Sequence, residues 1–312
     1  MAKVSRKTPI SFLLAPIKKF VRSAPLYDHY SPPSFKNLLW QRSALLLYST
    51  KREILFGTKI RKRVEELRLM KGAFAGTPAL VIANGPSAKG ISQESVQNLR
   101  RNKCKFYVMN EFYRNEQLTS IIEPDFYFMT DPVWENEDRY RTSPLHEYFN
   151  IHTDCREVRP ASTELSKLFT KKPLYVNWIP GAGLVKAFNP IGWRCYPDGV
   201  LFSVLAFAKY VGHYPVYVIG ADTSMYMNHY VTREGIIRVS KASLHSYPEE
   251  GVDNEIDPQL TRHMSDVLFS AARFLDDLRR YCADFAVNVG VDDTTNDALP
   301  RGCLLSKPHG HL

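Results

Sequence analysis

One short stretch, residues 79–91, constrains the fold of this chain more than any other part of the sequence. It begins with five consecutive apolar residues, as expected of a strand that is buried on both faces of a parallel sheet. Four turn-forming residues, Asn84-Gly85-Pro86-Ser87, end that strand. Ser92 then stands at the N-cap position of a helix that runs to about residue 100. The stretch predicts a strand, a turn and a helix in direct succession.

The turn after this strand is the first candidate site. Free amides and the dipole of a helix N-terminus both favour phosphate, so such a corner can bind a nucleotide. Gly85 would let a ligand approach the backbone, Pro86 would fix the turn and Ser87 would supply a hydroxyl. An ordinary βα turn without a ligand explains the same residues, because the Gly-x-Gly-x-x-Gly fingerprint is absent. Both interpretations stay open on this pattern alone.

From residue 73 onward, strand-like runs alternate with helical patterns. The expected strands are 79–83, 105–109, 126–130, 174–178, 216–220 and 285–289. The expected helices are 92–101, 111–120, 199–211 and 264–281. This alternation predicts an α/β fold with a mostly parallel, Rossmann-like sheet. In such sheets ligands bind beyond the carboxyl ends of the strands.

Polar residues directly follow four of the expected strands. Asn, Asp and Ser are common at strand ends, but they also offer donors and acceptors to a base, a ribose or a phosphate. Four strand ends of one sheet that carry such groups predict a nucleotide site. Its candidate residues are Asn84, Gly85, Pro86, Ser87, Asn110, Thr130, Asp131 and Asp222.

Residues 223–262 show little regular periodicity and directly follow a strand end, so we expect a lid over the site. His263 comes next, at the start of the expected helix 264–281. A helix N-terminus disfavours the imidazolium, so a neutral imidazole that accepts a proton fits this position. On spacing alone, a surface histidine near a helix cap is the simpler explanation.

The basic charge of the chain is confined to its N-terminal end. Residues 1–70 carry fifteen Lys and Arg against four Asp and Glu, a balance of +11, and subtracting it from the net +9 leaves −2. We therefore divide the chain into a basic helical arm, 1–72, and a catalytic domain, 73–312, and expect Gly57 to split the arm's apolar pattern into two helices. The arm packs on the body or on a second subunit, which is slightly favoured, or lies on an anionic membrane surface. The body lacks a basic face, which argues against nucleic acid as a partner.

The five cysteines are widely spaced and form no Cys-x-x-Cys pair. This pattern indicates neither a zinc site nor a disulfide framework and fits a reducing cytoplasm. The apolar run at 11–15 is too short for a signal peptide, and no run reaches the length of a membrane span. We expect a cytoplasmic protein without a cofactor, with peripheral contact at the inner membrane as the alternative use of the arm.

Two segments, Val81-Ile-Ala-Asn-Gly-Pro-Ser87 and Tyr107-Val-Met-Asn-Glu-Phe-Tyr113, resemble the opening of the small bacterial lipo-oligosaccharide sialyltransferases. Those enzymes also carry a Ser-Gly-Val turn into a buried helix and a strand that ends in Gly-Ile-Asp. Asp198-Gly199-Val200 and Gly220-Ala221-Asp222 occupy the corresponding places here. The resemblance covers roughly residues 78–300.

The resemblance implies a variant glycosyltransferase A fold and a CMP-sugar donor. Sialic acid or a related ulosonic acid would pass, with inversion, to a glycan or lipo-oligosaccharide acceptor. Tyr226 and Tyr230 would contact the leaving phosphate, and His263 precedes Phe274-Leu275 by the spacing of the family's catalytic histidine. No Asp-x-Asp metal clamp occurs in the chain, so the resemblance implies a metal-independent reaction. A homo-oligomer is compatible with this assignment.

The chain departs from that family in three places. Asp198 replaces a serine, Ser224 stands at a second phosphate-binding tyrosine, and residues 140–200 do not match the family's acceptor segment. These departures concern the donor sugar more than the nucleotide.

A second family, the motility-associated and hydroxymethylpterin pyrophosphokinase-like proteins, shares the Gly-Pro-Ser turn. Its Pro-Asp…Asp-Pro strand is similar to residues 124–132. That resemblance implies an ATP-dependent pyrophosphokinase with Mg²⁺ held by carboxylates such as Asp131 and Asp222. A non-catalytic module of surface-glycan assembly is the third hypothesis.

Overall fold

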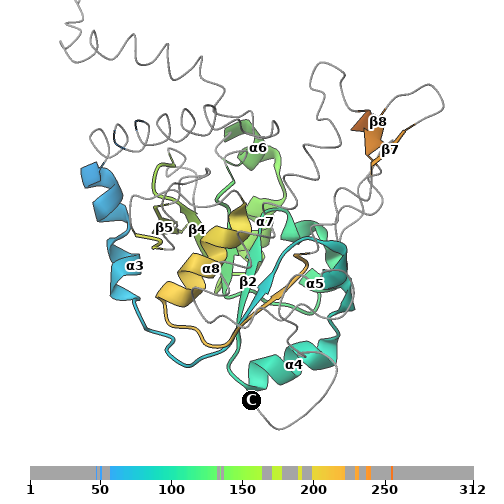
Figure 1. The fold of residues 1–312 in the computed structure, drawn as a ribbon, viewed down its shortest axis with the longest axis horizontal. Helices are drawn as coiled ribbons and strands as arrows, with labels where there is room; N and C mark the ends of the chain where they lie inside the picture. The colour runs from blue at the N-terminus through green and yellow to red at the C-terminus, as the bar shows by residue number, and fades with distance from the viewer. Residues whose placement is uncertain are drawn as a thin grey trace, which may run out of the picture.

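The protein is an α/β fold built on one six-stranded, all-parallel sheet (Figure 1). The computed structural model describes residues 47, 50, 57–131, 134, 137–163, 171–177, 189–191 and 199–221, and the backbone of 229–231, 237–239 and 254–255. The strands are β1 (Ala79–Ile82), β2 (Lys105–Met109), β3 (Phe126–Phe128), β4 (Arg156–Pro160), β5 (Leu174–Val176) and β6 (Val216–Ile219).

The strand order β5-β4-β3-β2-β1-β6 shows where the chain reverses direction. The sheet grows outward from β1 to β5, and the chain then returns to place β6 on the other side of β1. This reversal makes the boundary between β1 and β6 the topological switch point of the sheet.

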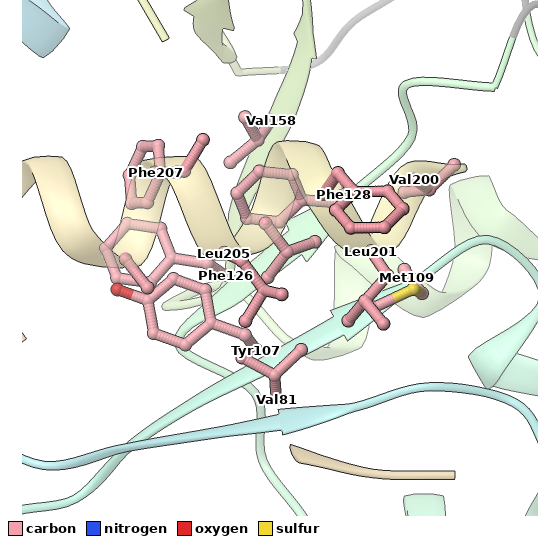
Figure 2. Packing of buried hydrophobic residues seen from close by; sticks show 14 of the residues in the cluster. Val81, Tyr107, Met109, Phe126, Phe128, Val158, Val200, Leu201, Leu205 and Phe207 are labelled. Atoms are coloured by element: carbon pink, nitrogen blue, oxygen red, sulfur yellow. The ribbon is translucent and has the colours of Figure 1, made fainter. Parts of the chain in front are cut away.

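Helices cover both faces of the sheet because side chains alternate between faces along each strand. One face packs on α8 (Val200–Tyr210) and α3 (Glu65–Leu69). The other face packs on α4 (Gln93–Arg101), α5 (Glu116–Thr119) and α7 (Leu145–Ile151). Figure 2 shows the first interface, where aromatic rings of β2 and β3 meet Phe207 of α8. The remaining elements on this sheet's connections are η1 (Pro86–Gly90), η2 (Phe112–Arg114) and α6 (Glu137–Thr142).

Five predicted strands, two predicted helices and the mostly parallel sheet are confirmed, with element ends within two residues of the expected ones. The predicted helix 111–120 is wrong in form: η2 and α5 replace it. Asn115 separates them, because its side chain accepts the Leu118 amide at 3.0 Å and caps α5. The predicted strand 285–289 and helix 264–281 lie outside the described residues.

Strand β4 was not predicted, because its sequence Arg-Glu-Val-Arg-Pro does not read as apolar. Glu157 and Arg159 are nevertheless buried, and Arg159 Nε donates to Glu157 Oε1 at 2.6 Å. The pairing lets two charged residues occupy an interior strand.

The end of the basic arm belongs to the folded body. Residues 57–63 are helical, and Ile60, Val64 and Leu67 are at most 2% exposed. Residues 57–69, the end of the expected arm, therefore pack on the body, and the division between 72 and 73 stays a prediction. Gly57 itself is helical, and the break in the described helix falls at Val64. The arm before residue 57 lies almost entirely outside the described residues.

The expected lid contains regular structure. Residues 229–231, 237–239 and 254–255 form strands β7 (His229–Val231), β8 (Ile237–Val239) and β9 (Asn254–Glu255) of an antiparallel sheet. Such short strands are defined by their pairing and not by a long periodic pattern, so the sequence did not reveal them, and the role of this segment as a lid stays a prediction. Within the described part of the chain, no helix is both long and apolar enough to cross a membrane.

Candidate functional site

Two asparagines mark the carboxyl ends of the adjacent strands β1 and β2. Asn84 Nδ2 donates to the carbonyl of Met109 at 3.1 Å, so the two strand ends are joined. The Oδ1 atoms of Asn84 and Asn110 are both buried, and neither has a hydrogen-bond partner among the described residues. Buried polar atoms are normally satisfied, so each such exception calls for an explanation. Two unsatisfied acceptors at neighbouring strand ends are well placed to bind a ligand that carries N–H or O–H groups.

The backbone of Asn110 is held on both sides. Its φ angle is +51°, in the left-handed region that asparagine tolerates better than most residues. Its N–H donates to the Phe128 carbonyl at 2.9 Å, and its carbonyl accepts the Tyr127 hydroxyl at 2.7 Å. The same hydroxyl accepts the Tyr113 amide at 3.1 Å. These bonds fix the turn that ends β2, and the buried carboxamide oxygen has no partner among the described residues.

The turn after β1 is fastened to the end of β6. Gly85 N–H donates to the Gly220 carbonyl at 2.8 Å, and Gly220 N–H donates to Ser87 Oγ at 3.1 Å. Gly220 has a φ of +75°, and a Cβ there would lie 2.2 Å from the Ala83 carbonyl oxygen. Only glycine fits at this close approach of the two strand ends. The hydroxyl that we expected to bind a nucleotide thus holds the sheet together at its switch point.

The expected phosphate-binding corner is not formed by free amides. Gly85 and Ala88 donate their amides to carbonyls, and Pro86 has none to offer. A 3₁₀ helix follows the strand, and α4 begins only at Gln93, where Ser92 caps it by accepting the Ser95 amide at 3.1 Å. The helix and its cap were predicted correctly, whereas the Gly85 amide of the expected corner is bonded to the Gly220 carbonyl, which follows the distant strand β6.

The side chain of Thr130 is hydrogen-bonded to α8. Its side chain is fully buried, and its Oγ1 lies 3.0 Å from Ser203 Oγ, which donates to the Val200 carbonyl. Because the Ser203 hydroxyl donates its hydrogen to that carbonyl, Thr130 is the donor in the bond between the two hydroxyls. The first turn of α8 is thereby attached to the end of β3. Figure 2 shows Val200 on the same side of the core as Met109 and Phe128, the last residues of their strands.

The N-terminus of α8 therefore lies at the edge of the sheet that carries Asn84 and Asn110. Gly199 precedes the helix with a φ of +115°, and no described side chain caps the first turn. Positive helix-dipole potential at this edge favours a negatively charged group.

Asp131 is half-buried at the end of β3, and its carbonyl accepts the Trp134 amide at 3.0 Å. Arg159 Nη1 donates to the Trp134 carbonyl at 3.3 Å, and the guanidinium lies 4.8 Å from the Tyr140 ring centre. Burial raises the pKa of Glu157 more than the neighbouring Arg159 lowers it. This buried pair supports the turn that carries Asp131. This pair was not predicted, because its only signal in the sequence is two charged residues spaced i, i+2.

The remaining site candidates are not placed. Asp222, Tyr226 and His263 lie outside the described residues. Tyr230 is on β7, opposite Arg238 of β8, but only its backbone is described. Among the described side chains, no three His, Cys, Asp or Glu residues group as metal ligands would. The described part of the site thus consists of Asn84, Asn110, Asp131 and the α8 N-terminus.

In comparisons with known proteins, no protein-family model, no curated protein and no solved structure matches the chain.

Proposed function

We propose that this chain is an inverting, metal-independent glycosyltransferase that moves sialic acid or a related ulosonic acid from a CMP donor to a surface glycan. One observation carries the nucleotide part of this proposal. Two buried carboxamide oxygens without partners, on Asn84 and Asn110, lie at neighbouring strand ends of a parallel α/β sheet. Ligands of such sheets bind at this edge.

The chemistry of these oxygens favours a nucleoside over a phosphate. A carboxamide oxygen can only accept hydrogen bonds, and a phosphate at neutral pH has few or no protons to donate. Cytidine offers an exocyclic amino group and ribose hydroxyls as donors. Asn84 and Asn110 therefore bind the nucleoside of the donor. The phosphate and the sugar carboxylate lie toward the N-terminus of α8, where the dipole is favourable.

The reaction itself follows from the resemblance to the lipo-oligosaccharide sialyltransferases. An acceptor hydroxyl attacks the anomeric carbon, the bond to the phosphate oxygen breaks and CMP departs. His263 accepts the proton of the acceptor hydroxyl. Tyr226 and Tyr230 donate hydrogen bonds to the phosphate as its charge develops, which lowers the barrier. The acceptor is a glycan or lipo-oligosaccharide, and the enzyme works in the cytoplasm or at the inner membrane.

A pyrophosphokinase is less well supported. Of the two strand aspartates that suggested it, Asp125 lies at the start of β3, where Lys105 and Arg100 bind it at 2.7 and 2.6 Å. Asp131 lies at the opposite end of the same strand. Of the two aspartates in the resembling strand, only Asp131 therefore lies at the edge where a nucleotide would bind, and Asp222, the second carboxylate expected to hold Mg²⁺, lies outside the described residues.

Ligand-induced stabilisation tests the nucleotide assignment, since a ligand raises the melting temperature by mass action. CMP, UDP, GDP and ATP are compared, each with and without EDTA. CMP should stabilise the protein most, and EDTA should not matter. Stabilisation by ATP that EDTA removes would instead support the pyrophosphokinase. A folded protein that responds to no nucleotide would support the non-catalytic module.

Substitution of His263 tests the reaction. His263→Ala should lower turnover on the order of a hundred- to ten-thousand-fold, because general-base assistance is lost, while CMP affinity stays unchanged. The neighbouring histidines of the expected lid, His229 and His245, are the controls. Loss of activity in a control variant, with His263→Ala still active, would reassign the base.

A further inference from the structure

The hydroxyl of Tyr127 forms the connection between the core of the protein and the turn that carries Asn110. Tyr127 lies in the middle of β3 and is fully buried. Its hydroxyl donates to the Asn110 carbonyl at 2.7 Å and accepts the Tyr113 amide at 3.1 Å. We propose that Tyr127 is a positioning residue, which holds the Asn110 carboxamide in the orientation that binds the nucleoside. The inference rests on the proposed nucleotide site.

Asn110 needs such a support because its own side chain provides none. Its backbone is in the left-handed region, which is unfavourable for any residue with a side chain. The carboxamide oxygen has no partner among the described residues, so no bond to that atom orients the side chain. Its direction follows from the backbone, which is fixed by the Phe128 carbonyl on one side and by the Tyr127 hydroxyl on the other. Without the hydroxyl, the carbonyl of Asn110 loses the hydrogen bond that fixes the peptide after it.

The second bond of the hydroxyl makes the support rigid. Tyr113 belongs to η2, so one oxygen atom joins both ends of the turn between β2 and that helix. Pre-organising a binding group in this way raises affinity, because less conformational freedom is lost when the ligand binds.

The ring of Tyr127 is fixed independently of its hydroxyl. The rings of Phe112, Tyr148 and Phe149 surround it at centroid distances of 6.3, 5.4 and 5.3 Å. Burial also holds the pKa of Tyr127 well above 10, so the hydroxyl stays protonated and remains a donor. Tyr127→Phe therefore removes one oxygen atom and leaves the aromatic packing in place.

Two other buried tyrosines provide matched controls. Tyr148 packs on Tyr127 itself, but its hydroxyl has no hydrogen-bond partner among the described residues. Tyr107 donates its hydroxyl to His213 Nε2 at 2.6 Å, and His213 in turn bonds to the Thr77 carbonyl, before the start of β1. Tyr148→Phe therefore removes a hydroxyl with no described partner, and Tyr107→Phe removes one that bonds to His213 and not to Asn110.

The test measures CMP affinity by calorimetry, thermal stability, and exchange of the Tyr113 amide by NMR for the full chain and the three Phe variants. Tyr127→Phe should weaken CMP binding about five- to tenfold, as expected for one lost hydrogen bond, and speed exchange at Tyr113. Tyr107→Phe should lower the melting temperature with unchanged CMP affinity. Tyr148→Phe should change neither. In the Asn110→Gly background, Tyr127→Phe should have no further effect on CMP affinity, because the carboxamide that it positions is gone.

The outcomes separate this inference from the proposed function. Wild-type CMP affinity in Tyr127→Phe, or equal weakening in all three variants, overturns the positioning role and leaves the nucleotide site intact. Further weakening by Tyr127→Phe in the Asn110→Gly background overturns the route through Asn110. Failure of the wild-type protein to bind CMP overturns the proposed function, and the positioning role with it.

Discussion

The buried side chain of His213, in the turn after α8, should make the stability of the protein fall in mild acid. His213 is 5% exposed, and its ring is bonded to the Thr77 carbonyl at 2.8 Å and to the Tyr107 hydroxyl at 2.6 Å. A carbonyl can only accept, so Nδ1 carries the proton and Nε2 accepts from the tyrosine. Both nitrogens are thus used in the neutral form, and protonation of Nε2 would break the bond to Tyr107. Burial lowers the pKa of His213 from 6.5 to about 4, although the Thr77 carbonyl and Asp125 act in the opposite direction.

The sign and size of the effect follow from this pKa. Below pH 6.5 the unfolded chain binds a proton at His213, whereas the folded protein does not until about pH 4. Its contribution to stability is therefore complete above pH 6.5 and is lost as the pH falls to 4. At about 1.4 kcal/mol per pH unit, the loss over this window is about 3 kcal/mol. Burial alone would raise the pKa of Asp125, but hydrogen bonds from Lys105, the Phe106 amide and Arg100 lower it below 3.8. The contribution of Asp125 to stability is therefore lost at a lower pH than that of His213.

Urea unfolding between pH 7.5 and 4 measures this loss. His213→Gln should be less stable than the wild type at neutral pH, since it loses the bonds to Thr77 and Tyr107. Its free energy of unfolding should fall less steeply with acid, so that the two proteins converge by about 3 kcal/mol. His146→Gln, at an exposed position on α7, is the control and should keep the wild-type slope. Parallel pH profiles for the wild type and His213→Gln would refute the neutral, buried assignment.

Two further predictions concern the packing of the body. Gly220→Ala should destabilise the protein by about 2–4 kcal/mol in urea unfolding, since it adds both a strained φ and a clash with Ala83. Gly76→Ala has a similar φ, +73°, but nothing within 4 Å, so it should cost only about 1–2 kcal/mol, and equal losses would mean that the clash is relieved. Deleting residues 1–56 should leave the melting temperature within a few degrees, because the helix that packs on β5 stays. Deleting residues 1–70 should prevent stable folding, since each large buried aliphatic residue it removes is worth about 2–5 kcal/mol, and an intact melting transition after that deletion would contradict the packing of 57–69.

Strands with continuous apolar runs were predictable, and the one with buried charges was not. Residues 79–83 and 216–220 indicate strands that are buried on both faces, because such burial requires apolar residues all along the strand. In β4 the buried positions include Glu157 and Arg159, and the Arg159 guanidinium donates a hydrogen bond to the Glu157 carboxylate. No local pattern reveals that pairing, because its favourable energy depends on partners from the 134–140 region as well.

The candidate site was predictable in its location but not in its bonding. Polar residues at strand ends placed Asn84 and Asn110 together, and the register of β1 and β2 confirms that neighbourhood. Which atoms remain available depends on contacts between distant segments. The Gly85 amide and the Ser87 hydroxyl both bond to Gly220, more than a hundred and thirty residues away in the sequence. A sequence motif cannot show that its own donors are already in use.

In the proposed function, the hydrogen-bonded and unpaired groups at the strand ends determine where a nucleotide would bind. Ligands of doubly wound sheets bind in the crevice at the switch point, which in this chain is the boundary between β1 and β6. Here the bonds of Gly220 to Gly85 and Ser87 close that boundary, whereas the unsatisfied oxygens lie over β1 and β2. In the proposed function, a nucleoside bound to Asn84 and Asn110 would lie over β1 and β2, on the β3 side of that boundary. The first turn of α8, which Thr130 and Ser203 attach to the end of β3, would be available to its phosphate on the same side. The hydrogen bonds of Gly220 at the β1–β6 boundary and the unpaired oxygens over β1 and β2 thus favour one direction of nucleoside binding across the sheet edge.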